Sequence, residues 1–169
     1  MQTANEEVIN HVRANIAFEQ MVAAVLYGAF ACGGVRLVLA VLSVLVGGAS
    51  FLGILDAVID TLLYAFLIFL VGFSAAVVIA IPLFLTLEKR RYRKPWPYLI
   101  AAIIVELVFF FVVQGDIAVL IDAPLAHAIA WLAPAPVIAV LFGRFMKPLW
   151  RQAERSDSPA ENSVIIRLD

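Results

Sequence analysis

The sequence predicts an all-α polytopic membrane protein, a four-transmembrane-helix bundle with an N-terminal interfacial amphipathic helix. The 169-residue chain is 64% hydrophobic and 15% charged, whereas soluble domains average about 45–50% apolar and about 25% charged residues. Lys and Arg are absent from two long stretches, 37–88 and 95–143. Apolar residues run continuously through both stretches, which favours helices over the alternating strands of a β-barrel.

Each of these stretches is long enough for two helical crossings, because a crossing needs about 20 mostly apolar residues. We expect the four spans at residues 36–53, 59–87, 98–113 and 125–145. The two turns between them are then expected near residues 53–60 and 114–124.

Charge predicts the orientation of these spans. Basic residues gather at 89–94 and 144–155, whereas the two expected turns carry only acidic charges, at Asp56, Asp60, Asp116 and Asp122. Since cytoplasmic loops are enriched in Lys and Arg, both termini and the basic loop are expected on the cytoplasmic side. Short loops and a clean charge bias are typical of the bacterial inner membrane.

The N-terminal part does not fit a simple crossing. Apolar sequence begins at Met21, so a helix from there to Leu55 would be about 50 Å long, against a hydrocarbon core of about 30 Å. Gly33-Gly34 offers a break, and residues 1–35 are therefore expected to form a cytoplasmic or interfacial helix. The alternative is a long tilted crossing that begins near Phe18 and buries Arg36, which costs several kcal/mol.

Three regions follow from this division. Residues 1–35 form the interfacial helix, residues 36–150 the transmembrane bundle, and residues 151–169 a flexible cytoplasmic tail. The end of that tail has a composition typical of disorder.

Glu106 is the most informative single residue, because it lies near the middle of the third expected span. An ionisable group at that depth must face the bundle or a wet cavity. Glu106 is therefore a candidate proton or cation site. Equally, it could be a protonated carboxyl that hydrogen-bonds to a neighbouring helix.

Two further groups of acidic residues are weaker candidates. Asp56 and Asp60 are four residues apart, so they share one face of a helix and could bind a cation. As charges at the start of a span they also suit a helix N-terminus, which is the favoured interpretation. Asp116, Asp122 and His127 are expected in a solvated loop. We predict no metal site and no cofactor.

The basic residues are expected to contact anionic lipid headgroups or a partner protein. They are Arg36, Lys89, Arg90, Arg91, Arg93 and Lys94. Proline predicts two irregularities in the spans: Pro134-Ala135-Pro136 is expected to kink the fourth, and Pro82 the second more mildly.

No Gly-rich phosphate loop, Gly-x-Ser-x-Gly or His-Glu-x-x-His motif is present. The sequence therefore predicts a non-enzymatic accessory, assembly or anchoring subunit of a larger membrane complex or homo-oligomer. Its partners would be the lipid bilayer and another membrane protein or a second copy, not nucleic acid. The alternative is a small oligomeric transporter or channel that uses Glu106.

Overall fold

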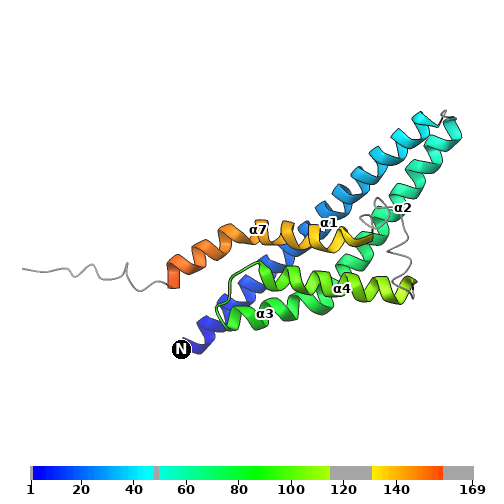
Figure 1. Ribbon diagram of the computed structural model, residues 1–169. Helices are drawn as coiled ribbons and strands as arrows, with labels where there is room; N and C mark the ends of the chain where they lie inside the picture. The colour runs from blue at the N-terminus through cyan, green and yellow to red at the C-terminus, as the bar shows by residue number, and fades with distance from the viewer. Residues whose placement is uncertain (1, 48–49, 115–130, 158–169) are drawn as a thin grey trace, which may run out of the picture.

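The computed structural model describes residues 2–47, 50–114 and 131–157, with side chains from residue 12 to residue 154 within those ranges. All regular structure in these residues is helical, which confirms the predicted all-α class (Figure 1). The elements are α1 (Gln2–Val46), α2 (Phe51–Ala75), the π-helical turn η1 (Ala76–Ala80), α3 (Ile81–Lys89), α4 (Trp96–Gln114) and α7 (Pro134–Asp157).

Helix α1 is unbroken, so the break predicted at Gly33-Gly34 is wrong. The helix has 45 residues and is about 67 Å long at 1.5 Å per residue. Gly33 serves close packing instead, because a Cβ atom there would lie 3.0 Å from the Cβ of Ala65 in α2. The absent side chain lets the two helices approach each other. The boundary at residue 35 is therefore not a helix end, and Arg36 lies within α1.

The first reversal of the chain lies earlier than predicted. Helix α1 ends at Val46 and α2 starts at Phe51, whereas the turn was expected at 53–60. Ser50 explains the difference, because its side-chain oxygen accepts a 3.1 Å hydrogen bond from the N–H of Gly53. Such a cap satisfies a donor that the first helical turn leaves unpaired. Asp56 and Asp60 therefore lie within α2 and not in a turn.

The second long helix contains an irregularity close to the expected proline. Helix α2 continues through η1 into α3, and the backbone N–H of Ile81 donates to the carbonyl of Ala76 in the wider π pattern. Pro82 follows directly. Proline lacks the N–H that an α-helix needs and clashes with the carbonyl four residues earlier. A π turn relieves this conflict while keeping the helix continuous.

The fourth predicted span, 125–145, falls partly outside the described residues. Within them, Trp131 and Leu132 are helical, Ala133 forms a bend, and α7 starts at Pro134. The kink predicted at the prolines is therefore a break between two helical segments. Helix α7 extends past the expected end of the span to Asp157.

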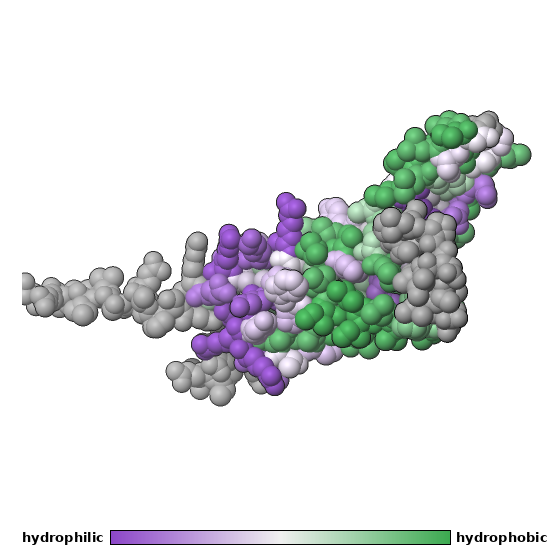
Figure 2. Space-filling view, in the orientation of Figure 1, coloured by the Kyte–Doolittle hydropathy of each residue, from purple (hydrophilic) through white to green (hydrophobic). Residues whose placement is uncertain are grey.

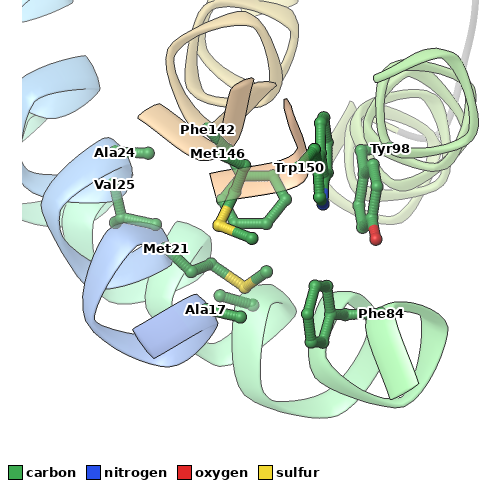
Figure 3. Packing of buried hydrophobic residues seen from close by; sticks show 10 residues of the cluster. Ala17, Met21, Ala24, Val25, Phe84, Tyr98, Phe142, Met146 and Trp150 are labelled. Atoms are coloured by element: carbon green, nitrogen blue, oxygen red, sulfur yellow. The ribbon is translucent and has the colours of Figure 1, made fainter. Parts of the chain in front are cut away.

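The helices share one packed core. Helix α1 packs against α2, α3 and α7, and α4 packs against α7. Ten buried residues form this core, nine of them labelled in Figure 3: Ala17, Met21, Ala24, Val25, Ala76, Phe84, Tyr98, Phe142, Met146 and Trp150. Within it, the rings of Tyr98 and Trp150 are stacked with their centroids 6.0 Å apart. The core joins the first half of α1 to α3, α4 and α7.

The outer surface is mostly apolar. Within the described residues, three helical stretches are long and apolar enough to cross a membrane: Val12–Val46, Phe51–Lys89 and Trp96–Val113. Figure 2 shows a broad hydrophobic area on the visible face of the bundle, with most of the hydrophilic residues of that face at one end. The chain is therefore a membrane-embedded helical protein.

Candidate functional site

The central feature of the site is a contact between α4 and the start of α7. The Oε2 atom of Glu106 accepts a 2.8 Å hydrogen bond from the backbone N–H of Ala135. Pro134 opens α7, and the N–H groups of the first helical turn have no partner within their own helix. The helix dipole also places partial positive charge there. The break at Ala133 therefore creates the donor that holds Glu106 in the apolar interior.

Glu106 faces a cavity of about 390 Å³ between α2, α4 and α7. Its walls are mostly apolar, and they include Leu63, Leu67, Ile68, Val71, Gly72, Ala75, Val105, Pro134, Ala135 and Ile138. Five residues with polar or charged side chains also contribute: Arg36, Asp60, Tyr64, Glu106 and Trp131. The cavity thus combines a hydrocarbon-like lining with a few polar groups, which is the usual composition of a small-molecule site.

Aromatic side chains line the same cavity as Glu106. Phe109 is three residues after Glu106 on α4, a spacing that places both side chains on neighbouring positions of one helix face. Its ring lies 6.4 Å from that of Trp131, centroid to centroid, and both residues line the cavity. The part of the cavity beside Glu106 therefore has an aromatic wall.

A second polar group lies where α1 meets α2. The Nη2 atom of Arg36 is 2.5 Å from the Oδ2 atom of Asp60, and its guanidinium carbon is 4.4 Å from the centroid of the Tyr64 ring. The structure thus brings two predicted candidate residues together, although they come from different groups in the sequence. Asp56 is exposed and does not line the cavity. The headgroup contact of Arg36 stays a prediction.

The predicted basic residues after α3 divide into two kinds. Lys89, Arg90, Arg91 and Lys94 are exposed, as a contact with lipid headgroups or a partner requires. Arg93 differs from that expectation, because its side chain is only 4% exposed and its Nη2 atom lies 3.0 Å from the Oε1 atom of Glu88. Arg13 of α1 binds the same oxygen at 3.2 Å. Glu88 therefore ties the α3–α4 connection to α1.

The chain reverses tightly between these partners. Arg91 has a left-handed backbone, with φ of 54°, and the N–H of Tyr92 donates to the carbonyl of Leu87. This reversal brings Arg93 back to the end of α3, where it meets Glu88. One residue of the basic block, Arg93, therefore forms a buried ion pair with Glu88 instead of an exposed contact.

Several site residues were missed by sequence reasoning. Tyr64 could have been found, because it lies four residues after Asp60 on one face of α2. Trp131 and Ala135 could not, since their position depends on how α7 packs. Asp116, Asp122 and His127 lie outside the described residues. Within those residues, no group of three or more His, Cys, Asp and Glu side chains is placed to hold a metal ion.

Comparison of the chain with protein-family models, with curated proteins and with solved structures found no match.

Proposed function

We propose that this chain is a non-enzymatic accessory, assembly or anchoring subunit of a larger complex or homo-oligomer in the bacterial inner membrane. The observation that carries the proposal is a hairpin formed by the end of α1 and the start of α2, residues 37–47 and 50–55. Figure 1 shows these two helix segments projecting side by side beyond the rest of the described bundle.

The membrane-crossing helices differ greatly in length. Helix α4 has 19 residues and is about 28 Å long, close to the thickness of the hydrocarbon core. The apolar part of α1 has 35 residues, or about 52 Å. Such a mismatch requires strong tilt, local thickening of the bilayer or burial against other protein. The apolar part of α1 is thus longer than the bilayer thickness that α4 fits, and the hairpin is the part that extends past the other helices (Figure 1).

The side chains of the hairpin favour burial against protein. Eight bulky apolar residues there are exposed: Val38, Leu39, Leu42, Leu45, Val46, Phe51, Leu52 and Leu55. Large apolar patches of this kind mark interaction sites when lipid does not cover them. A second copy or a larger membrane protein would bury these residues at an interface.

We also propose four crossings, with the N-terminus, the basic loop and the C-terminal end in the cytoplasm. Supporting this number, the start of α1, the α3–α4 connection and the end of α7 all lie at one end of the described bundle (Figure 1), which is the hydrophilic end in Figure 2. Reporter fusions at Arg91 and at Asp157 should report the cytoplasm, and a fusion at Gly47 the opposite compartment. A Gly47 fusion in the same compartment as Arg91 would overturn this topology.

Cross-linking in native membranes tests the subunit proposal. In a Cys32→Ser background, Leu42→Cys or Leu52→Cys should yield a cross-linked dimer or an adduct with another membrane protein. Ile104→Cys, on the exposed face of α4, is the matched control and should react less. A dimer identifies a homo-oligomer, and a defined adduct identifies a complex. A chain that stays monomeric and uncross-linked at every hairpin position is not such a subunit.

One observation favours the alternative, an oligomeric transporter or channel with Glu106 as a proton or cation site. Glu106 faces a cavity, and its hydrogen bond comes from the start of a broken helix. Broken helices build the ion and substrate sites of many transporters. Flux into proteoliposomes should then depend on Glu106, and flux that Glu106→Gln leaves unchanged would remove this alternative.

A further inference from the structure

We infer that the cavity beside Glu106 binds an organic monocation with an apolar body. This site goes beyond the subunit proposal, and its binding can be measured whether or not the chain assembles or transports anything. The inference rests on charge, on the aromatic wall and on the size of the cavity.

The charges of the cavity favour a cation. Arg36 and Asp60 form an ion pair with each other, so together they contribute no net charge. Glu106 is the remaining carboxyl group among the described lining residues. The Ala135 N–H holds Oε2, and no hydrogen bond from a described residue reaches Oε1. An anion would therefore face two carboxylates and one arginine already bound, whereas a cation would find an oxygen available.

The aromatic wall favours the same sign of charge. Phe109 and Trp131 line the same cavity as Glu106, and the faces of aromatic rings attract cations through their quadrupole. The rings and the carboxyl group of Glu106 therefore favour the same kind of ligand.

The described lining does not suit Ca²⁺ or Mg²⁺. Ca²⁺ takes six to eight oxygen ligands and Mg²⁺ needs six in near-ideal geometry. The described part of the cavity offers the Glu106 carboxyl and an Asp60 carboxyl bound to Arg36. The remaining walls are largely hydrocarbon, and the volume of about 390 Å³ lies in the range of sites for drug-sized molecules. The ligand should therefore carry one charge on a bulky apolar body.

Tetraphenylphosphonium is a suitable probe, because tetraphenylborate has nearly the same shape and the opposite charge. With the full chain in dodecyl maltoside, calorimetric titration should show saturable binding of the cation at one site per chain and no saturable binding of the anion. Glu106→Gln should weaken cation binding by about tenfold or more, since it removes the carboxylate that would pair with the cation. Asp56→Asn removes an acidic side chain of α2 that does not line the cavity, so it should leave binding unchanged.

A second variant guards against a failure of Glu106→Gln to fold. Phe109→Leu keeps the carboxyl group and removes one ring, and it should weaken cation binding by about threefold or more. The inference would be overturned if the cation and the anion partitioned equally, or if Glu106→Gln and Phe109→Leu both bound tetraphenylphosphonium with wild-type affinity. Native mass spectrometry provides a further test. If the wild-type chain retains a phospholipid that tetraphenylphosphonium does not displace, the cavity is a lipid site and the inference is wrong.

Discussion

The backbone N–H of Ala135 and the carboxyl group of Glu106 are joined by a 2.8 Å hydrogen bond that crosses from the first turn of α7 to the middle of α4. The two residues are 29 positions apart in sequence. This bond pairs an N–H that the first turn of α7 leaves without a partner in its own helix with a polar group in the middle of α4.

Replacing Glu106 tests that coupling. Glu106→Leu removes the acceptor and leaves the Ala135 N–H without a partner, so we expect a loss of about 1–2 kcal/mol of unfolding free energy. Glu106→Gln keeps a carbonyl oxygen at the same place and should lose less. Unfolding by sodium dodecyl sulfate in mixed micelles measures both. Equal stability of Glu106→Leu and wild type would show that the bond contributes nothing.

The Glu88 ion pairs should contribute strongly to stability at the end of the bundle that carries the basic residues. Arg93 is 4% exposed, and Glu88→Gln would replace the carboxylate that contacts both Arg93 and Arg13 by a neutral amide. We expect a loss of about 3 kcal/mol, as for other broken buried pairs. Thermal unfolding in detergent measures it. The neighbouring change Lys89→Gln is exposed and should stay within about 0.5 kcal/mol, so similar effects of the two changes would contradict this role.

The Arg36–Asp60 pair should be weaker. Its side chains are 36% and 62% exposed, and exposed pairs contribute about 0.2–1 kcal/mol. A double-mutant cycle with Arg36→Gln and Asp60→Asn should give a coupling in that range, which falls as salt is raised because screening weakens exposed pairs. A coupling that salt does not change would place the pair in a drier environment than the structure gives it.

Two glycines in different surroundings should respond in opposite directions to alanine. A Cβ atom at Gly143 would lie 2.8 Å from the Cβ of Pro95, so Gly143→Ala should cost about 1–3 kcal/mol through overpacking. A Cβ atom at Gly34 meets nothing within 4 Å, and Gly34→Ala should stabilise α1 by up to about 1 kcal/mol. Thermal unfolding compares them. Destabilisation by Gly34→Ala would indicate that α1 needs a flexible point there.

The accuracy of the sequence predictions differed from element to element for physical reasons. The span at 98–113 matches α4 closely, because the apolar run is bounded by Lys94, Pro95 and Pro97 on one side and by Gln114 on the other. The prediction of a turn at 53–60 is wrong because two aspartates four residues apart can lie on one face of a helix as well as in a turn. The signal that decided the start of α2 was the Ser50 cap, three residues before Gly53.

The local sequence pattern predicts the depth of a site residue but not its partner from another helix. The depth of Glu106 in a helix follows from the length of its apolar run, but its partner comes from α7 and depends on packing. The unbroken α1 is a similar case. A Gly-Gly pair is a weak point in an isolated helix, whereas contact with Ala65 makes Gly33 favourable in the folded chain.

The π turn Ala76–Ala80 has a consequence for the inward-facing side chains of the second long helix. It accommodates one residue more than an α-helix would in the same rise, and each α-helical residue rotates the chain by about 100°. If the same residues formed a regular α-helix, every side chain after the turn would be rotated by about 100°. Phe84, which is 4% exposed in the core, would then point away from its present neighbours, whereas deletion of one residue within the segment should restore a regular helix that keeps the later side chains in place.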